Sequence, residues 1–309
     1  MSKISVNHPS SAHELSASVS SATVIKQNEP MAKHTTLRVG GPADVYVEPA
    51  SEADLAAILK FCHERGLNFF ILGRGSNLVV RDGGFRGVVI CLSQPAFSKI
   101  EIVGEKITAG AGAKQKNVAV EAKRAGMSGV EFLEGIPGNI GGALRMNAGA
   151  MGGETFNAVE SVRVMDYRGN ILEMKPAEMA VTYRCCGALK DKIALSVVFQ
   201  CKPEPRADIE VRMKAYSEKR WSSQPAAPSA GCMFKNPTTI PAGRLIDELG
   251  MKGSSVGGAM VSMEHGNFLV NSGKATAKDV LGLMAQLQAK AKAERDIELH
   301  SEVEIIGED

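Results

Sequence analysis

The chain of 309 residues has few aromatic side chains and no long apolar run. Only 5% of its residues are aromatic, with one Trp and four Tyr, so it lacks the material for a base-stacking platform on single-stranded nucleic acid. The net charge of +2 gives no excess that would predict binding to nucleic acid or to a charged membrane surface. No stretch reaches the roughly 18 apolar residues of a membrane-spanning helix. The sequence therefore favours an ordinary globular protein.

Its six cysteines form no C-x-x-C pair, and no histidine pair stands near them at metal-ligand spacing. This pattern predicts no metal site. The first 22 residues contain eight serines and no apolar segment of the kind found in signal peptides. We therefore expect a disordered tail over 1–22, and reduced thiols in a cytoplasmic protein.

The ordered part of the chain is expected to begin with a mixed region over 23–98. An alternating run, "PADVYVEP", predicts a strand, and Ser51 and Gly66 have the residue types of a helix N-cap and a helix stop. The apolar runs "NFFIL" and "GVVICL" follow as short strands on either side of a glycine-rich loop.

Three further regions are expected after residue 98. The segment 99–214 contains a hairpin, a helix, a pair of strands that turn at 168–170 and a further strand, "KIALSVVFQCK". The segment 215–298 contains helices, the last with the capping-box spacing of Thr276 and Asp279. A final strand, 299–309, closes the chain. The predicted class is α+β, with a two-part first region and a smaller α/β region after it.

Two glycine-rich stretches are candidates for a phosphate-binding role, "LGRGSNLVV" and "EGIPGNIGGALRMNAGA". Glycine permits close approach of backbone to an anion. The second stretch has the pattern of a helix start, where N–H groups are exposed. Each stretch alone is also compatible with a tight turn, and neither is a dinucleotide fingerprint. Together with "TAGAGA" at 108–113, they favour a bulky diphosphate cofactor.

Six motifs in this order resemble one family, the UDP-N-acetylenolpyruvoylglucosamine reductases. They are "HTTLRVGGPA", "LGRGSNLVV", "EGIPGNIGGALRMNAGA", "TYRCCG", "AGCMFKNP" and "ELHSEVEIIG", and they extend the resemblance over about 30–307. The chain is similar to the shorter subgroup, which lacks an inserted segment over the substrate.

The resemblance implies a flavoprotein of the vanillyl-alcohol-oxidase (PCMH-type) fold. FAD would be held non-covalently between the subdomains 23–98 and 99–214, and the UDP-sugar would bind to 215–298, with 299–309 returning to the FAD-binding half. The implied cofactor-binding residues are Gly73, Arg74, Gly75, Ser76, Asn77, Gly110, Gly138, Asn139, Gly141 and Gly142.

The reaction implied by the resemblance has two halves. NADPH reduces the flavin, and a hydride then passes to the enolpyruvyl double bond of UDP-N-acetylglucosamine enolpyruvate, which gives UDP-N-acetylmuramate for peptidoglycan. No protein partner is implied. Hydride addition leaves negative charge on the carbon next to the substrate carboxylate, and that charge requires a cation, hydrogen-bond donors and a proton source.

The family's cation and carboxyl correspond to Arg184 in "TYRCCG" and Glu302 in "HSEVEIIG". Without the motifs, Arg184 would be read as a surface guanidinium. His300, Glu302 and Glu304 would be read as one solvated face of a strand. With the motifs, Arg184 stabilises the enolate-like charge, and Glu302 acts protonated beside it.

The family commonly has serine where this chain has Cys232. A lone cysteine is more often a small buried apolar residue than a catalyst. A thiol with the reference pKa near 8.5 is roughly 97% protonated at pH 7, and it is a far stronger acid than a hydroxyl. We therefore interpret Cys232 as the proton donor to the substrate carbon.

The resemblance extends to substrate-binding residues, namely Tyr183, Lys235 and Asn236. Long-form members have a lysine in the linker ahead of "AGCMFKNP", where this chain has Ser223, so contacts to UDP from that linker are left open. His265 and Asn267 lie in the expected substrate region without an assigned role.

Other residues have structural interpretations. His34 suggests a covalent flavin link, as in some relatives of the fold, but a structural role is favoured. The adjacent pair Cys185 and Cys186 is interpreted as packing, because adjacent cysteines rarely bridge.

Two alternatives stay open at this stage. An oxidase of the same fold would consume an alcohol or lactone without NADPH, and it would have no use for Arg184, Cys232 and Glu302. A binding protein that has lost its chemistry would be yellow and would bind the sugar without turnover. Oxidation of NADPH only after the enolpyruvyl sugar is added distinguishes the reductase from both.

Overall fold

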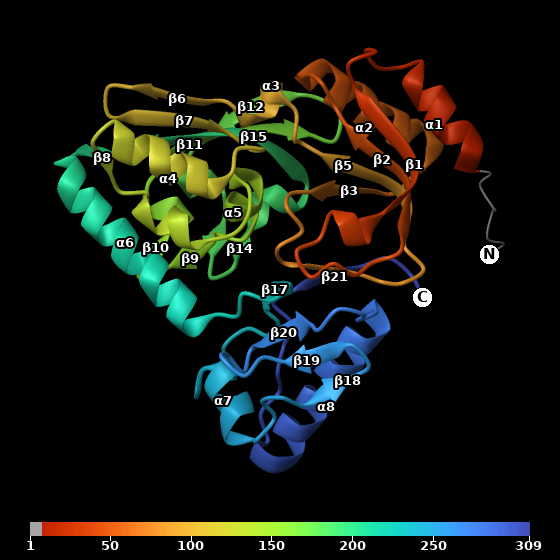
Figure 1. The fold of residues 1–309 in the computed structure, drawn as a ribbon. Helices are drawn as coiled ribbons and strands as arrows, with labels where there is room; N and C mark the ends of the chain where they lie inside the picture. Colours follow the sequence, from red (N-terminus) through yellow and green to blue (C-terminus); the bar gives the residue numbers. More distant parts are fainter. Residues whose placement is uncertain (1–7) are drawn as a thin grey trace. The chain divides into compact units, whose positions relative to one another are not determined.

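The computed structural model describes residues 8–309, which form two compact units (Figure 1). Within the described part of the chain, unit 1 contains residues up to 29, 44–73 and 87–217, and unit 2 contains 30–43, 74–86 and 218–309. The expected subdomains 23–98 and 99–214 thus fall largely into unit 1. The segments 30–43 and 74–86 group with unit 2 because Leu37, Val39 and Val79 are buried in its core.

The expected disordered tail is wrong for residues 8–22, and residues 1–7 lie outside the described part. Helix α1 covers His8–Ser16. Ala12 and Leu15, three residues apart on one helix face, are 4% and 0% exposed in the core of unit 1. The backbone N–H and the hydroxyl of Ser20 donate to Asp54 at 2.7 and 2.9 Å. Burial of two apolar side chains and these bonds order a segment whose serine content predicts disorder.

The first sheet of unit 1 has the strand order β1-β2-β5-β3, built from Val24–Pro30, Pro42–Glu48, Phe85–Cys91 and Phe69–Leu72. Helix α2, Glu52–Arg65, begins and ends as the sequence predicts. The hydroxyl of Ser51 accepts from the N–H of Asp54, and Gly66 takes the left-handed conformation with φ 61°.

The second sheet of unit 1 is antiparallel, in the order β12-β11-β15-β7-β6. The predicted hairpin is β6, Ile100–Val103, with β7, Lys106–Gly110. The predicted long strands are β11, Val159–Asp166, β12, Ile171–Met174, and β15, Lys192–Gln200. Helices α4, Gln115–Arg124, and α5, Ile140–Arg145, pack on this sheet, which places the start of α5 beside the end of β7.

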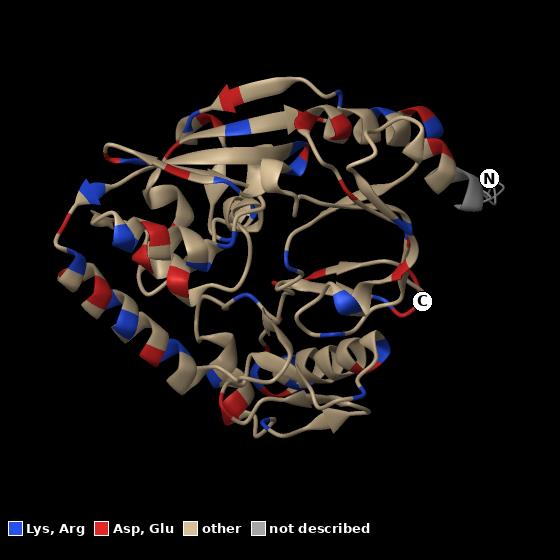
Figure 2. Ribbon diagram, turned by 45° about the horizontal axis from the view of Figure 1, so that its top comes forward, with Lys and Arg blue, Asp and Glu red and all other residues tan. Residues whose placement is uncertain are grey.

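Helix α6, Arg206–Ser223, carries charges of both signs, and Figure 2 shows them alternating along it. The guanidinium of Arg212 pairs with Glu131 at 2.7 Å and with Glu204, which ties α6 to unit 1. The remaining short elements of this unit are α3 Pro95–Ser98, β8 Met127–Ser128, η2 Glu131–Gly135, β9 Gly149–Ala150, β10 Gly153–Glu154, η3 Thr155–Asn157, η4 Pro176–Glu178, β13 Val181–Thr182, β14 Cys185–Cys186, η5 Gly187–Lys190 and β16 Lys202–Pro203.

Unit 2 contains the sheet β17-β20-β19-β18, built from Ser229–Cys232, Phe268–Asn271, Ala259–Val261 and Ser255–Val256. Helix α8, Ala277–Arg295, packs on this sheet (Figure 1), and α7, Ala242–Glu248, contacts α8. The predicted capping box of Thr276 and Asp279 is present. A short 3₁₀ helix, η1, covers Met31–Lys33.

The final strand is shorter than the sequence predicts. Strand β21 covers only Glu304–Ile306 and pairs in parallel with β4, Leu78–Val80. The chain before it changes partner, because the N–H of Glu302 donates to Met233 and the N–H of Glu304 donates to Asn77. The expectation that His300, Glu302 and Glu304 share one face of a continuous strand is therefore wrong.

Three findings apply to residues 8–309. No helix there combines the length and the apolar character needed to cross a membrane. No group of three or more His, Cys, Asp or Glu side chains there is arranged to hold a metal ion. All six cysteines lie in this range, and none is in a disulfide.

Candidate active site

In unit 1, the glycine-rich stretch "EGIPGNIGGALRMNAGA" lies directly against the stretch "TAGAGA" at 108–113. Asn139 is the N-cap of α5. The N–H groups of Ile140 and Gly141 donate to Ala113 and Ala111 at 2.9 and 2.7 Å, and the N–H of Gln115 donates to Gly138 at 3.1 Å. The segments 111–115 and 138–141 are thereby fixed side by side.

Several of these glycines are required by the protein's own backbone. A Cβ at Gly110 would lie 2.1 Å from the carbonyl oxygen of Phe97, and a Cβ at Gly141 would lie 3.2 Å from Cβ of Ala111. In unit 2, Gly75 has φ +60°, and its Cβ would lie 2.3 Å from the carbonyl oxygen of His34. Tight packing therefore explains these three positions without a ligand.

Gly142 and Gly73 are different. A Cβ on Gly142 would meet no atom within 4 Å, and a Cβ on Gly73 would meet only Asn139, at 3.9 Å. The amide of Asn139 donates to the carbonyl of Gly112, while its Oδ1 is buried and has no hydrogen-bond partner among residues 8–309. Gln115 is only 2% exposed, and its Oε1 also has no hydrogen-bond partner among residues 8–309. Open space beside glycine and two unsatisfied buried acceptors fit a polar, bulky ligand such as FAD.

Replacing Gly142 by alanine tests this fit. The added methyl group has room in the protein alone, and alanine is favoured over glycine in a helix by about 1 kcal/mol, so the free energy of unfolding of the FAD-free protein should not fall. If FAD lies beside Gly142, its dissociation constant should rise about tenfold or more. Titration of FAD into the FAD-free protein measures the effect. Gly282→Ala in α8, where the Cβ would be an ordinary 3.6 Å from Val256, is the control, and equal affinities would mean that Gly142 simply faces solvent.

Arg184 lies in unit 1 in the turn between β13 and β14. The two strands pair as Val181–Cys186 and Thr182–Cys185, so Tyr183 and Arg184 form the two-residue connection. Arg184 has φ 54°, an uncommon value outside glycine. Its guanidinium lies 4.9 Å from the centre of the Tyr183 ring and donates to the carbonyl of Gly149 at 3.5 Å. Tyr183 is 51% exposed and Arg184 is half-buried, so the turn presents the Tyr183 ring at the surface of unit 1.

Cys232 and Glu302 lie on neighbouring segments of unit 2. The N–H of Glu302 donates to the carbonyl of Met233 at 2.9 Å, and Phe234 bridges to Ser301 in antiparallel pairing. The side chain of Asn77 donates to the carbonyl of Glu302 at 3.1 Å. The structure therefore brings together two of the three predicted catalytic residues, 70 positions apart in the chain.

The first glycine-rich loop lies at the same place. Gly231 has φ +74°, and its Cβ would stand 3.6 Å from the carbonyl oxygen of Ser76. The hydroxyl of Thr36 donates to the carbonyls of both Ser229 and Gly75, at 2.6 and 3.2 Å. The backbone before Cys232 is thus held against residues 75–77.

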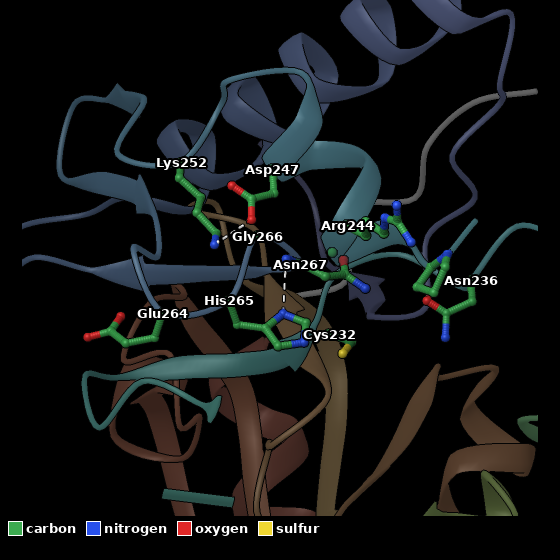
Figure 3. Close-up of a pocket in the computed structure, with 11 residues that line it drawn as sticks. Cys232, Asn236, Arg244, Asp247, Lys252, Glu264, His265, Gly266 and Asn267 are labelled. Carbon is green, nitrogen blue, oxygen red and sulfur yellow. Dashed lines mark hydrogen bonds and ion pairs between the residues drawn. The ribbon is translucent and has the colours of Figure 1, made fainter. Parts of the chain in front are cut away.

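A cavity of about 330 Å³ in unit 2 is lined by Cys232 and by polar side chains from α7 and the loop after β19 (Figure 3). Its lining includes Asn236, Arg244, Asp247, Lys252, Glu264, His265 and Asn267. Lys252 pairs with Asp247 at 2.8 Å, and Arg244 pairs with Glu248 at 2.8 Å. Burial, together with the charge of Lys252, lowers the pKa of His265 below its ordinary value, which keeps the imidazole neutral at pH 7.

Asn267 fixes the backbone that carries Cys232. It is 2% exposed. Its side chain accepts from the N–H of Phe234 at 2.9 Å and donates to the carbonyl of the same residue at 2.7 Å, while its own carbonyl accepts from Met233. One buried side chain thereby satisfies both backbone groups of Phe234.

Replacing Asn267 by alanine should lower the free energy of unfolding by about 2 to 3 kcal/mol, because the buried N–H and C=O of Phe234 lose their partner. Thermal or denaturant unfolding measures the loss. Asn117→Ala, at an exposed position of α4, is the matched control and should change stability by less than about 0.5 kcal/mol. A similar stability for the two variants would show that water replaces the amide at no cost.

Other predicted residues have mixed positions. Lys235 and Asn236 are exposed after β17, and Oδ1 of Asn236 accepts from the N–H of Ala242 at the start of α7. Ser223 is the last residue of α6 and donates to the carbonyl of Lys219, so Ser223 belongs to the helix and not to the expected linker over 221–230. Cys186 is buried and Cys185 half-buried in β14, as packing residues would be.

Two residues at the site have no distinguishing feature in the sequence. Gln115 stands at an otherwise apolar, buried position of α4. His265 was assigned no role, although it lines the cavity beside Cys232. Only tertiary contacts distinguish them from ordinary surface residues.

Comparison with known proteins agrees with this arrangement. Residues 43–175 match the FAD binding domain model, and residues 224–306 match the model of the UDP-N-acetylenolpyruvoylglucosamine reductase C-terminal domain. Relatives of that name in Bacillus licheniformis and Heliobacterium modesticaldum are 43% and 45% identical over 92% and 91% of this chain, and over 94% and 90% of their own. The crystal structure of the Thermus caldophilus reductase (MurB) has 38% identity and a TM-score of 0.80, covering 92% of this chain and 98% of that one.

The chain is therefore an FAD-dependent oxidoreductase of α+β fold, with an FAD-binding region followed by a smaller C-terminal region. It belongs to the UDP-N-acetylenolpyruvoylglucosamine reductase (MurB) family.

Proposed function

We propose that this protein reduces UDP-N-acetylglucosamine enolpyruvate to UDP-N-acetylmuramate with NADPH, in peptidoglycan precursor synthesis. When bound, FAD supplies the hydride that NADPH provides and the alkene accepts. The loops that we propose for FAD are 73–77 and 138–142, together with Gly110 and Gln115, which lie beside the second loop. The cytoplasmic location expected from the thiols stays a proposal.

Cys232 has the role of general acid in this proposal. Its S–H bond breaks, the proton goes to the substrate carbon next to the carboxylate, and the electron pair stays on sulfur as a thiolate. A positioned general acid contributes roughly 10²- to 10⁴-fold to a rate. The backbone bonds of the next two residues, from Met233 and Phe234 to Asn267 and from Glu302 to Met233, give Cys232 a fixed position.

Glu302 and Arg184 are proposed to stabilise the charge that develops on the substrate carboxylate. A protonated Glu302 can donate a hydrogen bond to that oxygen, and the guanidinium of Arg184 supplies a positive charge that does not titrate near pH 7. Arg184 belongs to unit 1 and Glu302 to unit 2. Tyr183, Lys235 and Asn236 are proposed to bind the substrate.

A single observation carries the proposal: Cys232 and Glu302 lie on adjacent backbone segments, joined by the bond from Glu302 N–H to the carbonyl of Met233. Paired backbone segments allow a thiol acid and a carboxyl to act on one substrate, as protonation of an enolate requires. A structural role for either residue alone gives no reason for this pairing.

The test is the absorbance spectrum of the purified yellow protein. NADPH should bleach the flavin, and the enolpyruvyl sugar should restore the colour with formation of UDP-N-acetylmuramate. Tight binding of the sugar to the yellow protein, with no recovery of colour, would identify a protein that binds the sugar without turning it over. Consumption of an alcohol without NADPH would identify an oxidase.

A further inference from the structure

His265 is held in a single orientation beside Cys232. The N–H of Asn267 donates to Nδ1 of His265 at 3.1 Å, and the carbonyl of Asn267 accepts from Met233, the residue after Cys232. The His265 ring packs edge-on against Phe268 at 4.8 Å between centres. Phe268 is the strand partner of Cys232. Both the Phe268 ring and the Asn267 backbone therefore link His265 to the segment that carries the thiol.

The bond to Asn267 also determines which nitrogen carries the proton. Because Nδ1 accepts a hydrogen bond, the neutral imidazole must have its hydrogen on Nε2. Figure 3 shows Nδ1 turned to Asn267 and the other ring nitrogen turned toward the sulfur of Cys232 across the cavity. The second ring nitrogen thus faces the side of the cavity on which Cys232 lies.

The charged groups around the His265 ring leave the imidazole in its neutral form. From α7, Asp247 is paired with Lys252 and Arg244 with Glu248. On the ring's own segment, Glu264 accepts from the hydroxyl of Ser262 at 2.5 Å. The positive charge of Lys252 and the burial of the ring disfavour the imidazolium, so His265 is a neutral donor.

We propose that His265 is a positioning residue for Cys232: its Nε2–H donates a hydrogen bond to the thiolate left when Cys232 gives up its proton. His265 keeps its own proton throughout, and water reprotonates the sulfur. The role in turnover rests on the proposed function, whereas the effect on the thiol does not depend on substrate.

The rate of alkylation of Cys232 by iodoacetamide tests the proposal in the flavin-loaded protein, without NADPH or sugar. The thiolate is the reacting form, and a hydrogen bond to a charged group is worth more than one pH unit of acidity. In His265→Phe, the pH midpoint of alkylation should rise by about one unit, and the rate near pH 7 should fall about tenfold. His265→Gln, which retains an N–H donor, should recover part of the difference.

Mass spectrometry of the peptide between Arg220 and Lys235 reports on Cys232 alone, since it contains no other cysteine. His63→Phe, at an exposed position of α2, is the control and should leave the midpoint unchanged. An unchanged midpoint in folded His265→Phe would overturn the proposal.

A second variant leaves the histidine in place. A Cβ at Gly243 would lie 2.8 Å from Cε1 of His265, so Gly243→Ala should push the ring away from its position. It should raise the alkylation midpoint in the same direction as His265→Phe. If His265→Phe does not fold, an unchanged midpoint in Gly243→Ala overturns the proposal. Absence of sugar-dependent colour recovery in the unmodified protein would instead refute the proposed function.

Discussion

In the Cys232→Ala variant, NADPH should still bleach the flavin, but the enolpyruvyl sugar should restore the colour at least 10²-fold more slowly. The variant loses the proton source that we assign to the substrate carbon, and a general acid contributes roughly 10²- to 10⁴-fold. The methyl group of alanine fits the space of the thiol, so FAD binding should persist. Stopped-flow absorbance, with NADPH added first and sugar second, separates the two halves of the reaction.

Two controls make this result specific. Cys232→Ser should retain measurable turnover, because a hydroxyl at the same place can donate a proton, though as a much weaker acid. Cys185→Ala, at a half-buried thiol of β14, should behave as the unmodified protein. Colour recovery at the normal rate in Cys232→Ala would remove Cys232 from the mechanism.

The Arg184→Gln variant should also lose sugar-dependent reoxidation, by about 10²- to 10³-fold, as expected when one fixed stabiliser of a developing oxyanion is removed. Reduction by NADPH should stay within about twofold, because charge on the substrate carboxylate develops only in the second half. The same stopped-flow experiment measures both rates. Glutamine has the same backbone preferences as arginine at φ 54°, so the turn is not relieved of strain.

The rate of sugar-dependent reoxidation in Arg184→Lys should lie between those of Arg184→Gln and the unmodified protein, since lysine keeps the charge but not the planar pair of donors. Arg168→Gln, in the exposed turn between β11 and β12, is the control for loss of a surface guanidinium. If Arg184→Gln slows bleaching by NADPH as much as it slows recovery, the residue supports the structure of unit 1 rather than the substrate's charge.

Much of the secondary structure follows from local sequence. Helix α2 begins at the Ser51 cap and ends at Gly66, and α8 begins with the capping box of Thr276. The hairpin β6–β7 and the pair β11–β12 also lie where alternation and turn residues predict them. These signals act over three or four residues, so they do not depend on the rest of the fold.

Two sequence predictions, the disordered start of the chain and the long last strand, are wrong because contacts between distant residues decide the structure there. The serine-rich start of the chain is ordered over α1 because Leu15 is buried in the core and Ser20 donates hydrogen bonds to Asp54. The last strand is cut to three residues because its N-terminal part pairs with another segment. Composition and alternation cannot report a partner that lies 34 residues away, as Asp54 does from Ser20, or still further along the chain.

For the candidate site, the sequence by itself determined the residue types and, through the order of its motifs, the family to which they belong. It named Cys232, Glu302 and Arg184, since such motifs are continuous in the chain. Tertiary structure alone decided that the segments of Cys232 and Glu302 pair, that packing explains Gly75 while Gly142 has open space beside it, and that His265 lines the same cavity as Cys232. The reason is physical: these relations depend on hydrogen bonds and packing between segments whose distance in the sequence bears no relation to their distance in space.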